Sequence, residues 1–354
     1  MSLDSAMTYK AYDKEEIVFG IERMPGQIRI AWEGTRALKL PAAYKKCANV
    51  VIVGMGGSAF APELCKSVFT DRLTVPVEVV RSYSVPAYTS SNTLVILSSF
   101  SGTTEEVLFA AREAKKTNAK IVALSTGGKL LAFAKRNKLP HYAFEPGDLA
   151  KQPRLGVGYM MIGTLGILER AGFIKVKAGE ISDMISSMSE VVDACALDVP
   201  AKINPAKVVA QELKDRAVLI VASEHLVGNA HAMSNQINEN AKQFADFMEV
   251  SELNHHLMEG LAYPKKFFEK FTVLMIRSEL YHPRIQKRYD ITAEVFEKQG
   301  ARVVDYCAGG GSKLEEAGEV LQFGSFMSYY LAMLNRVNPE EIPFVDWFKK
   351  KMQK

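Results

Sequence analysis

The chain has 354 residues, 48% of them hydrophobic and 24% charged, with 44 basic and 40 acidic side chains. This composition excludes a disordered or fibrous protein, and the length indicates two domains with buried cores. A net charge of +4 is too small to indicate a nucleic-acid partner. No apolar run reaches the ~20 residues of a membrane helix, so no membrane association is expected. Four widely spaced cysteines without a CxxC pair argue against disulfides and zinc, and favour the cytoplasm.

Strands and helices alternate along the first half of the chain. An amphipathic stretch at about 14–36 places an N-terminal helical segment over residues 1–40. Continuous apolar runs predict strands at 50–53, 76–81, 93–98 and 119–124. Helical spacing predicts helices at 58–69, 103–117, 156–171 and 178–194. Strands without polar alternation are typical of a parallel sheet covered on both faces, so we predict one α/β domain over residues 41–195.

The same alternation restarts after the Asp198-Val199-Pro200 boundary. Strands are predicted at 218–221, 272–276 and 302–306, and helices at 226–243, 284–299 and 312–334. We therefore predict a second α/β domain over 196–336. Both domains should be doubly wound parallel sheets of flavodoxin-like, three-layer α/β/α type. A C-terminal helical segment, 337–354, should contain a short helix that begins at Pro343.

A glycine-rich loop, Gly54-Met55-Gly56-Gly57-Ser58-Ala59, follows the first predicted strand. Its glycines allow close backbone approach to a ligand, and the next helix offers unpaired N–H groups to an anion. The loop also matches the GxGxxA pattern of dinucleotide-binding proteins. That pattern calls for an acidic residue at the end of the next strand, where this chain has Arg81, while Glu78 lies inside the strand.

A second loop, Ser98-Ser99-Phe100-Ser101-Gly102-Thr103-Thr104, joins a predicted strand to a helix. Several hydroxyl groups at a helix N-terminus can donate hydrogen bonds to a phosphate, whose charge the helix dipole favours. The alternative is an ordinary Ser or Thr helix cap, which requires one hydroxyl only. We interpret the loop as a phosphate site.

The spacing of these two loops resembles the signature of the sugar-isomerase (SIS) domain. The match continues through Pro153-Arg154-Leu155-Gly156, Asn238-Glu239-Asn240-Ala241-Lys242, Leu253-Asn254-His255 and Asp346-Trp347-Phe348-Lys349. These blocks resemble, in order, those of the bifunctional phosphoglucose/phosphomannose isomerases. The resemblance covers roughly residues 15–352.

This resemblance implies a set of site residues. It places the substrate phosphate on Gly57, Ser58, Ser99, Ser101 and Thr104. It makes Glu239 the catalytic base, puts Arg154 near the reacting carbons, and assigns ring opening to His255 and Lys349. It further implies a homodimer in which the neighbouring subunit contributes the histidine. Without the resemblance, each of these four residues has an ordinary structural explanation, as a solvated carboxylate, a surface cation, a capping histidine or part of a basic terminal turn.

The chemistry of the four residues agrees with the implied reaction. A carboxylate such as Glu239 can move a proton between adjacent sugar carbons if a partly dry site raises its pKa. Arg154 can stabilise the negative charge that develops on oxygen, and His255 can move the proton needed to open a sugar ring. We expect isomerisation of glucose 6-phosphate, and of mannose 6-phosphate, to fructose 6-phosphate through an enediolate, with no metal or other cofactor. The alternative is a non-catalytic regulatory protein that binds a sugar phosphate.

Overall fold

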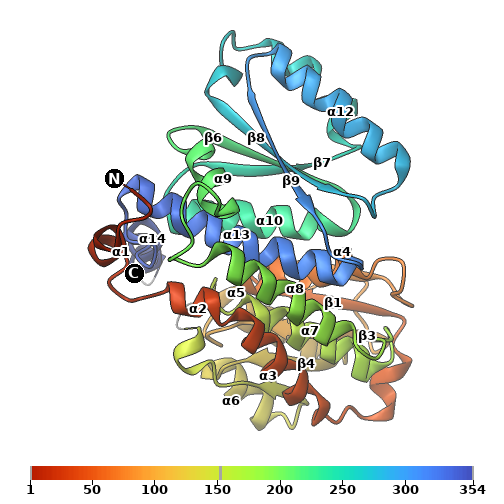
Figure 1. Ribbon diagram of the computed structural model, residues 1–354. Helices are drawn as coiled ribbons and strands as arrows, with labels where there is room; N and C mark the ends of the chain where they lie inside the picture. The colour runs from red at the N-terminus through yellow and green to blue at the C-terminus, as the bar shows by residue number, and fades with distance from the viewer. Residues whose placement is uncertain (1, 151–153, 353–354) are drawn as a thin grey trace.

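The structure is a computed structural model that describes residues 2–150 and 154–352, and it contains two parallel β-sheets with helices between them (Figure 1). The strands of the first sheet lie in the order β2-β1-β3-β4-β5. Neighbouring strands pair in parallel, as where Val50 of β1 lies opposite Leu94 of β3. The strands are β1 (Asn49–Val53), β2 (Val77–Val80), β3 (Thr93–Ser98), β4 (Lys120–Ser125) and β5 (His141–Ala143). The predicted flavodoxin-like order is confirmed for this sheet.

Helices cover both faces of the first sheet, so its central strands are buried on both sides. All six residues of β3 are buried. Val51 and Val95 pack on one side with α5, whereas Val50 and Ile52 pack on the other, in the main core. Successive residues of a strand point to opposite faces, so apolar side chains are needed at every position. The helices around this sheet are α4 (Gly57–Val68), α5 (Glu105–Lys116), α6 (Gly128–Arg136) and α7 (Val157–Ala171).

The second sheet repeats the arrangement, with its parallel strands in the order β7-β6-β8-β9. Its first strand in the chain, β6, is flanked by the next two, as β1 is in the first sheet. The strands are β6 (Ala217–Ala222), β7 (Ala245–Glu249), β8 (Phe271–Ser278) and β9 (Arg302–Ala308). The associated helices are α9 (Pro205–Leu213), α10 (Val227–Gln236), α11 (Leu253–His256) and α12 (Pro283–Lys298). Two doubly wound α/β units are thus present, as predicted.

A layer of helices separates the two sheets, and its longest member is α13 (Lys313–Asn335), which is buried around most of its circumference. Helices α8 (Glu180–Cys195) and α9 pack along it, while α3 (Met24–Arg36) packs on α7. The other N-terminal helices are α1 (Ala6–Tyr12) and α2 (Val18–Glu22). The shorter turns are η1 (Ala42–Lys46), η2 (Gly147–Leu149), η3 (Glu224–Leu226), the π-helical η4 (Ile237–Ala241), η5 (Glu259–Ala262) and η6 (Phe268–Lys270).

Helices α4 and α10 bridge the two units directly. Gly228 of α10 lies so close to α4 that a Cβ atom there would stand 2.4 Å from the Cα of Leu64. The N–H of Gly228 also donates to the Ser67 hydroxyl at 3.1 Å. One turn further along α10, the His231 ring faces Phe60, with the ring centroids 6.4 Å apart. The two helices are therefore antiparallel, and the end of α10 meets the start of α4.

Several elements were missed or misjudged by the sequence patterns. Helices α6 and α9 and strands β5 and β7 were not predicted, and the helix expected at 226–243 ends its α-helical part at Gln236. It continues as the π-helical turn η4, and the chain then enters β7. Strand β7 lies at a sheet edge and mixes buried and exposed residues, so it lacks the continuous apolar run of the central strands.

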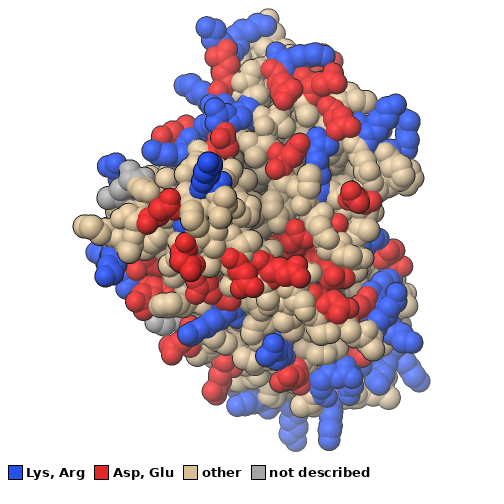
Figure 2. All heavy atoms as spheres, in the orientation of Figure 1, with Lys and Arg blue, Asp and Glu red and all other residues tan. Residues whose placement is uncertain are grey.

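Charges of both signs share the surface. On the face in Figure 2, acidic side chains form a band across the middle, with basic side chains above and below it. In the described part of the chain, no helix is long and apolar enough to cross a membrane.

Candidate active site

The hydroxyl-rich turn after β3 forms one wall of the site. Its hydroxyl groups pair with one another: Ser99 with Thr104 at 2.8 Å, and Ser101 with Thr103 at 2.9 Å. Thr104 is the N-cap residue of α5, yet its side chain makes no capping hydrogen bond. The structure therefore contradicts the simple helix-cap explanation and leaves a cluster of hydroxyls at the positive end of a helix, where an anion is favoured.

The glycine loop after β1 lies directly against this turn. The Phe100 N–H donates to the Ser58 hydroxyl at 2.9 Å, and the Ser98 hydroxyl donates to the Ser58 carbonyl at 2.7 Å. Close approach is possible because residue 54 is glycine: a Cβ there would lie 2.3 Å from the Ser58 carbonyl oxygen. Gly57 is the first residue of α4. The structure thus brings Gly57 and Ser58 together with the Ser99, Ser101 and Thr104 hydroxyls in one pair of turns, hereafter the cradle, at helix N-termini of the kind that favour anions.

Glu239 lies in η4, where the helix widens from α to π geometry. A π-helical turn displaces side chains from their α-helical positions and often occurs at functional sites. The Glu239 side chain is one third exposed, at 33%. The side chain is therefore partly buried and still accessible to a ligand.

Arg154 is held beside Glu239 by a set of fixed contacts. Its side chain is 3% exposed, and its Nη1 lies 3.6 Å from Glu239 Oε2. Its Nε donates to Asn240 Oδ1 at 2.9 Å, and its Nη2 donates to the Pro339 and Glu340 carbonyls at 2.9 and 2.5 Å. The guanidinium is thus a buried, oriented cation next to the carboxylate, and the surface-cation alternative is wrong.

Burial raises the pKa of Glu239 above the ordinary glutamate value, and the positive charges of Arg154, Lys349 and Lys242 oppose that rise. A glutamate with a raised pKa is a stronger base than a solvated one. Lys349 lies on α14 (Pro343–Met352), which has no buried residue. Its charge nevertheless acts on Glu239, whereas the neighbouring Lys350 is not among the groups that do so.

Glu239 and the cradle lie at the same end of the packed helices α4 and α10, as the antiparallel arrangement of these helices shows. Glu239 follows Gly228 by eleven residues, and Gly57 precedes Leu64 by seven. The difference between these two separations is about four residues. At about 1.5 Å of rise per residue, Glu239 therefore lies roughly 6 Å beyond the start of α4, measured along the common axis of the two antiparallel helices. Phe100, which lies between the cradle residues Ser99 and Ser101, also contacts Gly156: a Cβ at Gly156 would lie 2.2 Å from the Phe100 ring. Glu239, Arg154 and the cradle therefore border one region between the two units.

His255 is not part of this region in the same chain. It lies on α11, which follows the carboxyl end of β7, whereas Glu239 precedes the amino end of that strand. Five residues of strand separate the two ends, or roughly 16 Å. His255 is exposed. Within one chain, His255 therefore does not lie beside Glu239.

Two residues of this region carried no predicted role. Asn240 Oδ1 accepts the Arg154 Nε–H, and the Asn240 amide donates to the Ser328 hydroxyl at 3.0 Å. Lys242 directly follows η4 and lies near both Glu239 and Arg154. The resemblance had marked the Asn238–Lys242 block as a whole, and that was the only signal in the sequence for either residue. Pro153 of the block before Arg154 lies outside the described residues.

The described residues contain no candidate metal site, because no three His, Cys, Asp or Glu side chains among them lie close enough to share an ion. His231 Nδ1 instead lies 2.5 Å from Glu63 Oε2, and His225 Nε2 lies 2.6 Å from Glu316 Oε2. Both contacts are ion-pair or hydrogen-bond contacts within the protein, as expected for structural histidines. The four cysteines are free thiols.

The chain matches two known domain models. Residues 43–138 match the SIS domain, and residues 202–352 match the bacterial phospho-glucose isomerase C-terminal SIS domain. Two such domains, a cradle in the first and a carboxylate–guanidinium pair at their contact define a tandem SIS protein. The bifunctional phosphoglucose/phosphomannose isomerase of Caldicellulosiruptor bescii is 33% identical over 333 residues, which are 94% of this chain and 97% of that protein. The chain belongs to the family of bifunctional phosphoglucose/phosphomannose isomerases.

Other relatives agree with this assignment. The isomerase of the same name from Thermoplasma volcanium is 29% identical and covers 86% of this chain and 91% of its own. The D-glucosamine-6-phosphate 4-epimerase of Sulfolobus acidocaldarius is 26% identical, with 68% and 76% covered. Among solved structures, a glucose-6-phosphate isomerase like protein from Thermus thermophilus superposes with a TM-score of 0.65 at 16% identity, covering 98% of this chain and 99% of that one. At that identity the likeness concerns the fold alone.

Proposed function

We propose that this protein interconverts glucose 6-phosphate, and also mannose 6-phosphate, with fructose 6-phosphate. The observation that carries the proposal is the pair of Arg154 and Glu239, 3.6 Å apart and beside the cradle. A protein that only binds a sugar phosphate needs the cradle but no buried cation beside a carboxylate of raised pKa. The names of the family relatives point to the same reaction.

The reaction begins when Glu239 removes the proton from C2 of the open-chain aldose. The C–H electron pair forms the C1–C2 double bond, and the carbonyl π electrons move onto O1. Arg154 stabilises this developing enediolate oxygen from a fixed position, which avoids reorganisation during the reaction. Transfer of the O2 proton to O1 and return of the Glu239 proton to C1 complete the ketose. Atoms and electrons balance without an external oxidant or reductant.

The cradle would hold the phosphate away from the reacting carbons and thereby orient the chain. Gly57, Ser58, Ser99, Ser101 and Thr104 are its proposed contacts. The offset of Glu239 beyond the start of α4, roughly 6 Å along the helix axis, is compatible with a bound sugar that has its phosphate in the cradle and its carbonyl end beside Glu239. His255 of a second subunit and Lys349 are proposed to assist ring opening, a proton transfer between the anomeric hydroxyl and the ring oxygen.

We further propose a homodimer in which two chains complete each site. The separation of His255 from Glu239 within one chain supports this, because each site would otherwise lack its histidine. Helix α14 offers an additional contact surface, since its apolar side chains are exposed: Phe344, Val345, Trp347, Phe348 and Met352. The free cysteine thiols support a reducing, cytoplasmic location.

Purified protein should convert fructose 6-phosphate to both glucose 6-phosphate and mannose 6-phosphate in an enzyme-coupled assay. Glucosamine 6-phosphate serves as the comparison substrate, because a related chain carries the name of an epimerase for it. Thermal stabilisation by fructose 6-phosphate without turnover would support the regulatory alternative instead. Conversion of glucosamine 6-phosphate alone would reject the isomerase assignment.

Mixing inactive variants tests the shared site. A dimer of one Glu239→Gln chain and one His255→Ala chain has one intact site if the histidine crosses the interface. Random exchange of subunits should then restore about a quarter of wild-type activity, because half of the dimers are mixed and each has one site. The control mixes Glu239→Gln with Arg154→Ala, two changes on the same side of the site, and should restore none. Equal lack of activity in both mixtures would place His255 within its own chain's site or outside any site.

A further inference from the structure

Two cations of the site hold three consecutive backbone carbonyls of the linker between α13 and α14. The Lys242 ammonium donates to the Asn338 carbonyl at 2.5 Å and to the Asn240 carbonyl at 3.2 Å. Arg154 donates to the next two linker carbonyls, those of Pro339 and Glu340. The linker is therefore attached to the same helical turn, η4, that contains Glu239.

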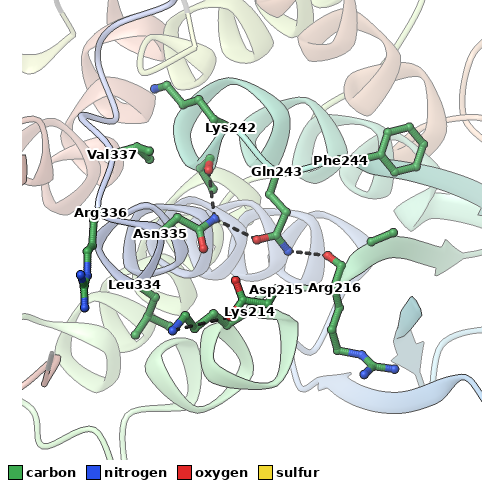
Figure 3. A pocket seen from close by; sticks show the side chains of 12 residues that line it. Lys214, Asp215, Arg216, Lys242, Gln243, Phe244, Leu334, Asn335, Arg336 and Val337 are labelled. Carbon is green, nitrogen blue, oxygen red and sulfur yellow. Dashed lines mark hydrogen bonds and ion pairs between the residues drawn. The ribbon is translucent and has the colours of Figure 1, made fainter. Parts of the chain in front are cut away.

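The backbone at Lys242 directs its side chain to the linker. Lys242 is the C-cap of η4 in the left-handed conformation, with φ at 52°. That conformation costs a residue with a Cβ roughly 1 kcal/mol or more, so its persistence calls for a compensating contact. Figure 3 shows the Lys242 side chain leading away from Gln243 and Asn335, on the side of the pocket where Arg336 and Val337 begin the linker. The side chain thus spans from the catalytic turn to the linker.

The linker matters because it is the covalent connection of α14 to the rest of its own chain. No residue of α14 is buried. The charge of Lys349 on this helix acts on Glu239, so the position of α14 bears on the proposed base. The residues that attach the linker consequently set where Lys349 lies.

We propose that Lys242 is a positioning residue that, by holding the Asn338 carbonyl, places the C-terminal arm (residues 337–352) so that Lys349 faces Glu239. This inference rests on the proposed function and adds a residue to its machinery. Besides opposing the rise in the pKa of Glu239 with its own charge, Lys242 acts through the arm.

The charges around Lys242 give the inference a pH signature. The groups that face it are Arg154 before α7, Glu239 in η4 and Glu341 in the linker. Burial and then the repulsion from Arg154 lower the pKa of Lys242 to about 8, and the two carboxylates oppose this. The ammonium therefore loses its proton as the pH rises through about 8, and the hold on the linker weakens over the same range.

The test compares Lys242→Met, Lys242→Arg and a control, Arg336→Met. Arg336 is also a cation in the left-handed conformation, at the C-cap of α13 and on the same pocket wall. With fructose 6-phosphate, Lys242→Met should lower kcat by up to about tenfold, no more than the loss expected for Lys349→Met, because its main effect passes through the position of Lys349. Lys242→Arg should stay within about threefold of wild type and lose the decline in activity near pH 8, because arginine does not titrate there. The control should match wild type in both respects.

A double-mutant cycle separates positioning from general damage. If Lys242 acts through Lys349, the Lys349→Met change should have little further effect in the Lys242→Met background. Full activity of Lys242→Met, additive effects of the two changes, or an unchanged alkaline decline in Lys242→Arg would each overturn the inference. Hydrogen exchange of the α14 amides gives a measurement independent of turnover: it should accelerate in Lys242→Met but not in Arg336→Met. A wild-type protein that converts no hexose phosphate would refute the proposed function, while the exchange result would still decide the positioning role.

Discussion

Replacing Glu239 by glutamine removes the proposed proton acceptor while keeping the shape of the side chain. General-base catalysis contributes roughly 10²- to 10⁴-fold to rate. The raised pKa of Glu239 and the adjacent Arg154 indicate that the base is already tuned in the free protein. We therefore expect kcat/KM to fall by about 10³-fold, which corresponds to about 4 kcal/mol of lost transition-state stabilisation.

The same change should leave phosphate binding and folding intact. The cradle hydroxyls make hydrogen bonds with hydroxyl and backbone N–H groups of the turn after β3, and none of these bonds involves Glu239. The dissociation constant for fructose 6-phosphate should therefore change by less than about threefold. Burial raises the pKa of Glu239, so its ionised form is disfavoured in the folded state at neutral pH. Glutamine carries no charge, and at neutral pH the melting temperature of the variant should not fall.

The assay couples glucose 6-phosphate formation to a dehydrogenase, and calorimetric titration with fructose 6-phosphate measures binding. Glu259→Gln provides the control, because Glu259 is an exposed glutamate of the same domain outside the site. More than a third of wild-type turnover in Glu239→Gln would refute the assignment of the base. A loss of turnover accompanied by a collapse of binding and of the melting temperature would show a structural residue instead.

Two of the three lysines of α14 should differ: Lys349→Met is expected to lower kcat about tenfold, and Lys350→Met to leave it unchanged, because of these two only Lys349 acts on the proposed base. Equal kinetics of the two variants in the coupled assay would contradict this. Gly102→Ala should destabilise the protein by about 2–4 kcal/mol, because its φ is 66° and a Cβ would lie 1.9 Å from a backbone carbonyl oxygen. Urea titration measures this against Gly26→Ala, which has open space and should change stability by less than about 1 kcal/mol. Activity should fall as the pH drops through the raised pKa of the proposed base, and Arg154→Met, which removes the nearest cation, should move that fall to higher pH. A pH profile of kcat/KM unchanged by Arg154→Met would count against the pairing.

The regular part of the fold could be predicted because burial on two faces leaves a clear pattern. β1 and β3 are apolar at nearly every position, and the predicted bounds of β3 match the structure. β7 could not be recognised in this way, since only its first residue is buried and the rest lie partly or fully exposed at a sheet edge. Strand β5 has only three residues, too few for any period to appear.

The two halves of the site differ in how well the sequence could locate them. The cradle follows a general rule, because ligands of α/β proteins gather beyond the carboxyl ends of the strands. Glu239 lies instead at the end of a helix, before the amino end of β7, and the rule does not cover that position. Its π-helical turn leaves no trace in the hydrophobic pattern. The family blocks were therefore needed to single it out.

Neither the hydrophobic pattern nor the family resemblance could predict the hydrogen bond from Lys242 to the linker. It depends on backbone carbonyls of residues 338–340, which any side chain can supply. Sequence patterns report side chains, so contacts to the main chain appear only when coordinates place them.

The tight contact at Gly228 also bears on which sugars can react. Because backbone meets backbone there, the packing of α4 against α10 fixes the separation of the proposed phosphate site from the proposed base. A pentose phosphate anchored at the same end would fall short of Glu239 by about one carbon–carbon bond, a shortfall of order 1 Å that can lower a rate roughly 100-fold. Discrimination between sugar phosphates of different length would then depend on the packing of α4 against α10, and not on contacts with the hydroxyl groups of the sugar.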